Sequence, residues 1–253
     1  MQDENNNKDF DLTVLPLKSE VTIPKNVRAT DPRLFDPHRG HCVMVIGPPF
    51  SSKTTLILNF FLNENFFKDY YQEIIVISPT MKNDATAKHL IENNPTYDYL
   101  DDHLINSILK YRAQQEEETR KNLAIIVDDA PALAGFKPGS RLDMLASNYR
   151  HILKSGDGLG GLLLVSSQKI RKIPSLYRAC ASVVITAKLN NEKELETLVD
   201  EYAGVFGGKK RFMESYQETF KEGKFNFMVM YINGNKTLKE PCIFKNFTQQ
   251  LYP

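Results

Sequence analysis

Residues 42–55 read CVMVIGPPFSSKTT, an apolar run that leads into a loop of small residues and then into a helical pattern. The apolar run predicts a buried β-strand, and residues 56–67 carry apolar side chains at helical spacing. Gly47 and Lys53-Thr54 have the spacing of a phosphate-binding loop, although Ser52 stands where a second glycine is usual. A strand before such a loop and a helix after it form the structural context in which this motif binds phosphates.

The chemistry expected of this loop is nucleotide binding. Successive backbone N–H groups and the positive end of the following helix would surround the phosphates. Lys53 would reach the β and γ phosphates, and the Thr54 hydroxyl would bind Mg²⁺. Serine in place of glycine at position 52 lowers the stability of the loop little if its φ is negative, and lowers it more if its φ is positive. The alternative is a Ser/Pro turn that caps a helix. The predicted nucleotide-binding residues are Gly47, Pro48, Ser51, Ser52, Lys53, Thr54 and Thr55.

A second apolar run, LAIIV at 123–127, ends in the acidic pair Asp128-Asp129. Ligands of open α/β sheets bind at the carboxyl ends of the strands, where this pair would lie. We expect Asp128 to hold Mg²⁺ through water and Asp129 to orient or deprotonate the attacking water. The alternative is an acidic pair that caps the turn before Pro131.

Further polar residues are candidates for sensing or stabilising the phosphates. The run LLLVSSQ at 162–168 ends in polar residues, so Ser167 or Gln168 would sense the γ-phosphate or position water. Arg150 and Arg178 are candidates for an arginine finger that reaches a neighbouring subunit's nucleotide. For each arginine, an ordinary solvated surface position is the alternative.

The whole pattern predicts an α/β fold with a mostly parallel sheet flanked by helices. Continuous β-branched runs without polar alternation indicate strands that are covered on both faces. The expected strands are 42–47, 74–78, 123–129, 162–168 and 182–187, with helices around 84–93 and 101–120. We divide the chain into an extended N-terminal arm (1–40), a P-loop core (41–190) and a C-terminal extension (191–253) that is helical over 192–220 and forms an edge strand over 224–233.

Composition excludes several classes of protein. The 32 basic and 31 acidic residues give a net charge of +1, which argues against a uniformly basic coat. The three cysteines lie far apart, which suits a reducing compartment and neither a disulfide framework nor a zinc site. No apolar run approaches the roughly 20 residues needed to span a bilayer, so no membrane contact is expected.

The ordered set of motifs resembles the FtsK/HerA-class genome-packaging ATPases of poxviruses, other large DNA viruses and virophages. The resemblance covers roughly residues 40–190. Six stretches carry it: GPPFSSKTT (47–55), IIVISPT (74–80), LAIIVDDA (123–130), NYRHILKSG (148–156), LLLVSSQ (162–168) and IPSLYRACASVVITA (173–187). Two departures are Ser52 in place of glycine and Asp129 where related ATPases often have glutamate.

The resemblance implies a P-loop NTPase with an additional-strand, RecA-like core. It implies a homo-oligomeric ring, a pentamer or hexamer, that hydrolyses ATP with Mg²⁺ and drives double-stranded DNA into a preformed capsid. Capsid or portal-vertex proteins would be its partners, and the virion or the host cytoplasm and virus factory its location. Thr54 and Asp128 would be metal ligands, and Asp129 and Gln168 would activate water and sense phosphate. Arg150 and Arg178 are both candidates for the trans-acting arginine.

Two other functions remain open. The first is a P-loop nucleoside or small-molecule kinase, although no obvious substrate lid lies between the strands. The second is a nucleotide-binding scaffold that hydrolyses ATP poorly, with Ser52 as the cause. For DNA contact, the loops KSGDG (154–158) and GGKKR (207–211) have flexible basic tips, and ordinary solvated loops are the alternative.

Overall fold

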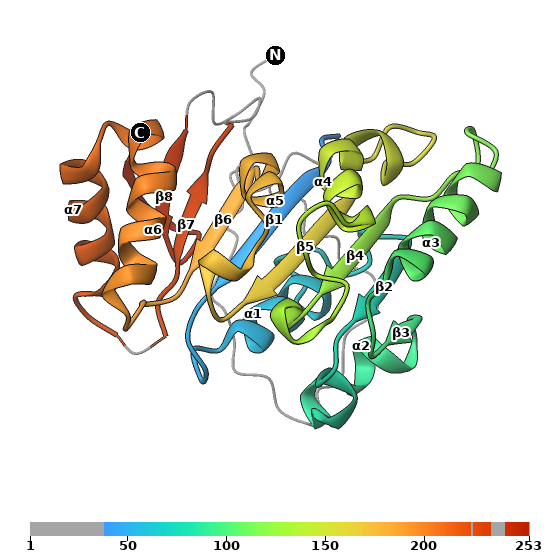
Figure 1. Cartoon of the computed structure of the whole chain (residues 1–253), viewed down its shortest axis with the longest axis horizontal. Helices are drawn as coiled ribbons and strands as arrows, with labels where there is room; N and C mark the ends of the chain where they lie inside the picture. The colour runs from blue at the N-terminus through green and yellow to red at the C-terminus, as the bar shows by residue number, and fades with distance from the viewer. Residues whose placement is uncertain (1–37, 224, 234–240, 253) are drawn as a thin grey trace, which may run out of the picture.

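The computed structural model describes residues 38–223, 225–233 and 241–252. Within these ranges the chain forms one nine-stranded sheet with helices on both faces (Figure 1). The strand order is β3-β2-β4-β5-β1-β6-β7-β8-β9. The arm expected over residues 1–40 lies almost entirely outside the described residues.

Six strands form the parallel part of the sheet, which confirms the predicted fold class. The strands are β1 (His41–Ile46), β2 (Glu73–Ile77), β3 (Thr96–Tyr97), β4 (Leu123–Val127), β5 (Leu162–Ser167) and β6 (Val183–Thr186). All residues of β1, β4, β5 and β6 are buried, as their continuous apolar runs predict. Because β5 lies between β1 and β4, the sheet has the additional strand that the resemblance implies.

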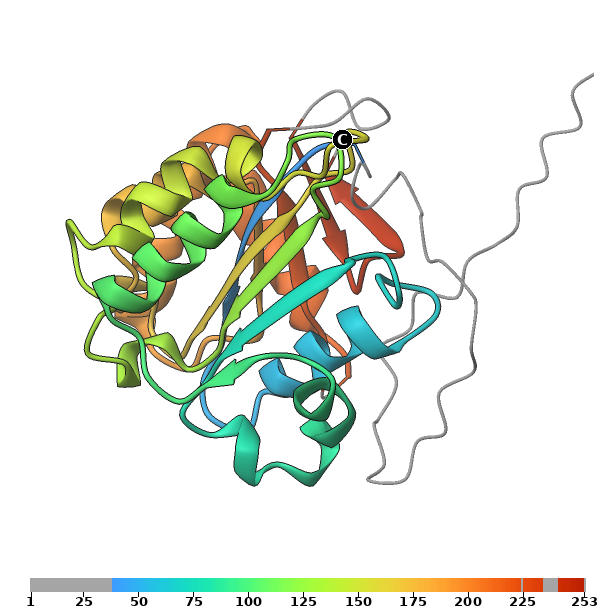
Figure 2. The same cartoon turned by 90° about the vertical axis from the view of Figure 1, so that its right-hand side faces the viewer.

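The helices cover the two faces of the sheet unequally (Figure 2). One apolar core joins the sheet to α1 (Lys53–Leu62) and α2 (Lys88–Glu92). The core on the other face includes residues of the remaining helices, α3 (Asp102–Gln114), α4 (Arg141–Ile152), α5 (Ser175–Cys180), α6 (Glu192–Tyr202) and α7 (Lys209–Phe220). Short 3₁₀ turns are η1 (Met81–Asn83), η2 (Ala85–Ala87), η3 (Ala130–Ala132), η4 (Ile170–Lys172) and η5 (Ala203–Phe206).

The C-terminal residues continue the same sheet in antiparallel fashion. The strands β7 (Met228–Tyr231), β8 (Cys242–Lys245) and β9 (Gln249–Tyr252) pair in succession, and β7 pairs with β6. The sequence predicted β7 within 224–233 but neither β8 nor β9.

Two predicted helices differ from those observed. The segment 84–93 is divided between η2 and α2, with the short strand β3 close behind. The helix expected over 101–120 ends at Gln114, because Gln115 has an extended backbone with φ −75° and ψ 137°. The charged run after Gln115 is therefore not helical. No helix in the described part of the chain has the length and apolar character needed to cross a membrane.

Candidate nucleotide site

Three strand ends at one edge of the sheet bring the candidate residues together. The phosphate loop follows β1, the acidic pair follows β4, and Gln168 follows β5. These three strands are parallel neighbours, so their carboxyl ends lie side by side. The sheet topology thus places motifs far apart in sequence at a single edge.

Gly47 occupies a position that no larger residue could take without rearrangement. Its N–H donates to the carbonyl of Ser167 at 3.2 Å, which ties the loop to the end of β5. A Cβ added to Gly47 would lie 2.5 Å from the Ser51 hydroxyl oxygen and 2.9 Å from the Ala187 side chain. The first glycine of the motif is therefore required by close packing of the loop on itself.

Lys53 turns back into the loop that precedes it. Its Nζ donates to the carbonyl oxygens of Gly47 at 2.8 Å and Pro48 at 3.0 Å. Burial lowers the pKa of Lys53, while the nearby carboxylates of Asp128 and Asp129 oppose that shift. The ammonium group thus lies within the curve of the loop, with the acidic pair in its electrostatic field.

Two non-glycine residues of the loop have left-handed backbone conformations. Ser52, the N-cap of α1, has φ 64° and ψ 25°, and Phe50 has φ 62°. Glycine adopts this region without cost, whereas a residue with a Cβ pays roughly 1–2 kcal/mol. Ser52 therefore has the positive φ that makes its substitution for glycine costly. The Phe50 side chain is 100% exposed.

Asp128 is almost completely buried, with 3% of its surface exposed. The Ser166 hydroxyl donates to its Oδ1 at 2.5 Å, and the Ser78 hydroxyl to its Oδ2 at 3.4 Å. Burial raises the pKa of Asp128, and neighbouring Asp129 adds to the rise, while the Ser166 hydrogen bond opposes it. The carboxylate is fixed in direction by hydroxyls from two neighbouring strand ends.

Asp129 leaves β4 through a left-handed turn with φ 49°. Its N–H donates to the Ser166 hydroxyl at 2.9 Å, and the Gln168 amide donates to its Oδ1 at 3.3 Å. Asp129 and Gln168 are therefore adjacent, as their predicted roles require. Ser167 instead donates to the carbonyl of Lys169 at 2.8 Å.

Ser166 and Ser78 were not predicted as members of this site. Ser166 both donates to Asp128 and accepts from the Asp129 backbone, so one hydroxyl links the two acidic residues. The available signal was a pair of serines that ends an otherwise apolar strand. Both are buried, and the inner one, Ser166, contacts the residues that follow β4.

Thr54 and Asp128 offer oxygen donors, which suit Mg²⁺. Among the described residues, no group of three or more His, Cys, Asp or Glu side chains could hold a metal by itself. Mg²⁺ fits such a sparse set, because it usually takes one or two protein oxygens and completes its shell with water and substrate phosphates.

The two candidate arginines do not lie within this chain's own site. A Cβ on Gly40 would be 3.3 Å from the Arg150 Cα, which places Arg150 beside the start of β1, the end of the strand opposite the loop. Arg178 forms an ion pair with Glu201 at 2.7 Å and donates to the carbonyl of Ile173 at 2.6 Å. Arg150 is exposed, and its Nε donates to the Tyr149 hydroxyl at 3.0 Å.

The sequence matches no protein-family model and no curated protein. Similar folds occur among solved structures. The genome packaging NTPase B204 of Sulfolobus turreted icosahedral virus 2, in complex with sulfate, has a TM-score of 0.55 at 14% identity, over 82% of this chain and 96% of that one. The DNA-packaging ATPase B204 of Sulfolobus turreted icosahedral virus has a TM-score of 0.55 at 15% identity, over 78% and 94%.

A third similar structure is the conjugation coupling protein TcpA of pCW3, in a monomer form with ATPγS. It has a TM-score of 0.50 at 12% identity, over 91% of this chain and 71% of that one. At these identities the similarity establishes a shared fold. That fold is the mostly parallel sheet flanked by helices that the ordered motifs predict.

Proposed function

We propose that this chain is an ATP-hydrolysing motor that moves double-stranded DNA into a preformed capsid. One observation carries the proposal: three adjacent parallel strands place Lys53, Asp128 and Gln168 close together after their carboxyl ends. These groups supply a phosphate-binding cation, a metal-binding carboxylate and a polar contact to the water-activating Asp129. The shared fold with viral packaging NTPases supports the choice of DNA over a small molecule as the cargo.

Each residue has a role in the proposed reaction. The loop amides and Lys53 would bind the phosphates. Thr54 and Asp128 would hold Mg²⁺, which would supply positive charge to the transferring phosphoryl group. Asp129 orients the attacking water, and Gln168 holds the Asp129 carboxylate toward it. Because the Lys53 ammonium bonds to loop carbonyls, it must leave Gly47 and Pro48 to reach a phosphate.

The proposal includes a homo-oligomeric ring in which a neighbour completes each site. Of the two candidate arginines, Arg150 is favoured as the trans-acting residue. Arg178 would have to give up its ion pair with Glu201 and its bond to Ile173. The exposed Arg150 contacts its neighbour Tyr149, in a hydrogen bond and a contact between guanidinium and ring, and forms no ion pair within the described residues.

The test is ATP turnover by the assembled protein with and without double-stranded DNA. Turnover should rise when DNA is added, and Lys53→Ala should lower it by at least about a hundredfold, because a preorganised charge at the phosphates is lost. Lys110→Ala, an exposed lysine on α3, is the matched control and should retain wild-type turnover. Turnover that ignores DNA but transfers phosphate to a nucleoside would instead favour the kinase.

The backbone strain at Ser52 favours a second candidate, a nucleotide-binding scaffold that hydrolyses ATP slowly. A scaffold would bind ATP tightly and show no turnover, with or without DNA. Ser52→Gly would then leave turnover at zero, whereas a motor slowed by strain would turn over faster after this substitution.

A further inference from the structure

The edge of the sheet at β2 is only partly covered. The neighbouring strand β3 pairs with Val76 and Ile77 alone, so Glu73, Ile74 and Ile75 pair with β4 on one side and have no strand on the β3 side in the described part of the chain. The chain cannot extend β3 in that direction, because the residues before Pro95 belong to α2 and its C-cap Asn93, which has a helical backbone.

The open backbone groups can be assigned by alternation along β2. On the β3 side, the N–H groups of Val76 and Ser78 donate to the carbonyls of Pro95 and Tyr97. On the β4 side, the N–H of Glu73 donates to the carbonyl of Asn122. Since successive residues of a strand point to opposite sides, the N–H and C=O of Ile74 face the uncovered side.

A groove of about 430 Å³ runs beside this uncovered stretch. Its apolar lining includes Ile74, Ile75, Tyr97, Leu104, Ile108 and Leu123. Native proteins usually protect an open strand edge with charge, proline or a covering segment. A groove that combines free backbone groups with apolar walls is suited to an added strand.

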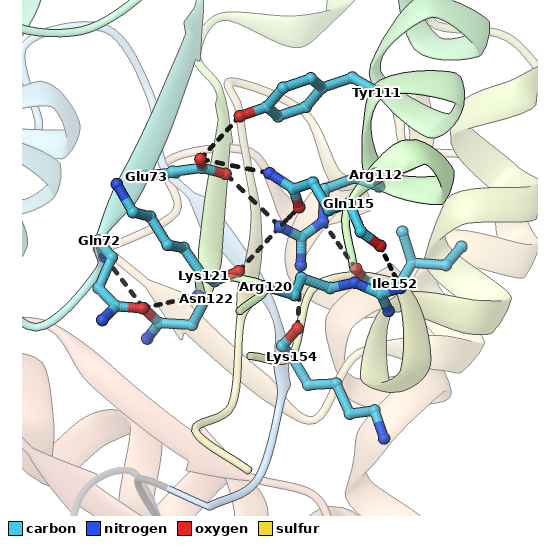
Figure 3. A network of polar contacts seen from close by, with 10 residues as sticks. All are labelled: Gln72, Glu73, Tyr111, Arg112, Gln115, Arg120, Lys121, Asn122, Ile152 and Lys154. Atoms are coloured by element: carbon cyan, nitrogen blue, oxygen red, sulfur yellow. Dashed lines mark hydrogen bonds and ion pairs between the residues drawn. The ribbon is translucent and has the colours of Figure 1, made fainter. Parts of the chain in front are cut away.

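The one charged side chain of the uncovered stretch is Glu73. An ion pair and hydrogen bonds hold its carboxylate in place (Figure 3). Its carboxylate accepts from the Tyr111 hydroxyl at 2.8 Å and from the Gln115 amide at 3.4 Å, and it pairs with Arg112 at 3.5 Å. These partners all come from the end of α3. Glu73 therefore does not act as a free charge that would repel an incoming apolar strand.

The geometry points to an occupant from this chain's own N-terminal arm: Val21, Thr22 and Ile23 would add to the open edge of β2 as a short strand. Two β-branched apolar residues with one threonine between them would place Val21 and Ile23 on one side. That side would face Leu104 and Ile108 of α3. Pro24 follows directly and lacks an N–H, so the added strand would match the short uncovered stretch.

The arm is long enough, and it leads into β1 at the end of the sheet where β2 also starts. Gly160 packs against Arg39, accepts a hydrogen bond from Asn122, and Asn122 in turn accepts from the N–H of Gln72. The first described residues thus lie at the same end of the sheet as the start of β2, where the strands β1, β2 and β4 begin. An added strand beside β2 would lie four strand spacings from β1, or about 19 Å, whereas residues 24–37 can span about 45 Å.

The test is hydrogen exchange of the Ile74 amide, resolved to single residues by mass spectrometry, in the full-length chain. The Ile74 N–H should be protected in the wild type. The double variant Val21→Asp/Ile23→Asp should raise its exchange rate by at least about tenfold, because the edge is reopened. The matched control, Leu12→Asp/Val14→Asp in the other apolar run of the arm, should leave Ile74 protected.

Three outcomes would overturn the inference. Ile74 could exchange equally fast in the wild type and in Val21→Asp/Ile23→Asp, or the Leu12→Asp/Val14→Asp control could release it as well. Protection that disappears on dilution would assign the added strand to a second copy of the chain instead of the same chain. None of these results depends on ATP hydrolysis, so the inference and the proposed motor are tested separately.

Discussion

At the scale of single residues, three of the six non-glycine residues with positive φ in the described part of the chain lie at the candidate nucleotide site. Phe50, Ser52 and Asp129 all have positive φ, and all three lie in the loop or directly after β4. Each such residue costs of order 1–3 kcal/mol unless its surroundings impose the conformation. The backbone shape of the candidate site therefore lowers the stability of the folded protein.

Replacing Ser52 with glycine should stabilise the protein. Glycine adopts φ 64° without steric cost, so Ser52→Gly should raise the free energy of unfolding by about 1 kcal/mol. Chemical denaturation measures the change. Ser51→Gly is the matched control, because Ser51 has no positive φ and should lose about 0.5–1 kcal/mol. Equal effects of both substitutions would contradict the assignment of strain to Ser52.

Replacing Asp128 with asparagine should separate stability from activity. Burial raises the pKa of Asp128 in the folded state, so its ionisation opposes folding as the pH rises above the unfolded value of about 3.9. Asp128→Asn should be more stable than the wild type at pH 7 and should lose this advantage below about pH 4.

Denaturation curves at pH 7 and pH 3.5, with ATP turnover at pH 7, test this prediction. Turnover should be lost in Asp128→Asn, since the carboxylate proposed to hold Mg²⁺ is gone. A stability gain that is the same at both pH values would show that ionisation of Asp128 does not cause it.

Several site residues could be predicted from the sequence because their spacing carries the signal. Lys53, Asp128 and Gln168 each follow a recognisable buried strand, and parallel strands bring their ends together. Ser166 could not be predicted, since its role depends on which strand neighbours β4. The positive φ of Ser52 also required the structure, because a sequence does not fix a torsion angle at a non-glycine residue.

At the scale of elements, one buried arginine connects three segments. Arg112, 3% exposed, donates from α3 to the carbonyls of Lys121 at 2.8 Å, Ile152 at 3.1 Å and Lys154 at 2.9 Å. It thus joins the end of α3 to the residues before β4 and to the end of α4 (Figure 3). Burial lowers the pKa of Arg112, and the charge of Glu73 opposes that shift.

Removing this connection should destabilise the protein. Arg112→Met keeps an apolar stem but leaves three carbonyls without their donor, so the free energy of unfolding should fall by about 2–4 kcal/mol. Lys110→Met, an exposed position on the same helix, should change stability by no more than about 0.5 kcal/mol. Chemical denaturation measures both. A loss below about 1 kcal/mol for Arg112→Met would mean that water replaces its hydrogen bonds.

The same arginine explains why a helix end was predicted wrongly. The charged run that begins at Gln115 has good helix formers, and propensity alone extends the helix to residue 120. The long-range bonds of Arg112 and the bond from its side chain to Gln115 Oε1 at 2.6 Å accompany a helix end at Gln114. Tertiary contacts of this kind leave no mark in local sequence.

At the scale of the whole molecule, the near-zero net charge requires any DNA contact to be local. In the two basic loops, Lys154 pairs with Glu117 at 3.9 Å and Lys209 with Asp200 at 2.7 Å. Lys210 and Arg211 are exposed at the start of α7. We therefore expect phosphate contact to come mainly from the loop 207–211.

Salt dependence of DNA binding tests this expectation. Affinity of the assembled protein for double-stranded DNA should fall with salt, with a log–log slope of about −0.9 for each phosphate contact. Lys210→Ala should make the slope shallower by about one contact per bound subunit, without changing sequence preference. Lys110→Ala should leave the slope unchanged, and an unchanged slope for Lys210→Ala would remove the loop from the DNA path.

The central position of β1 has a consequence for how the protein forms. Residues 41–46 pair with residues 162–167 on one side and 183–186 on the other, so both partners are made long after β1 itself. Pairing between such distant segments is slow, and domains of this size commonly fold through intermediates. During synthesis, the loop after β1 therefore exists before the strands that flank β1, β5 and β6, have been made. The candidate nucleotide site is therefore completed late, once β5 and β6 have left the ribosome.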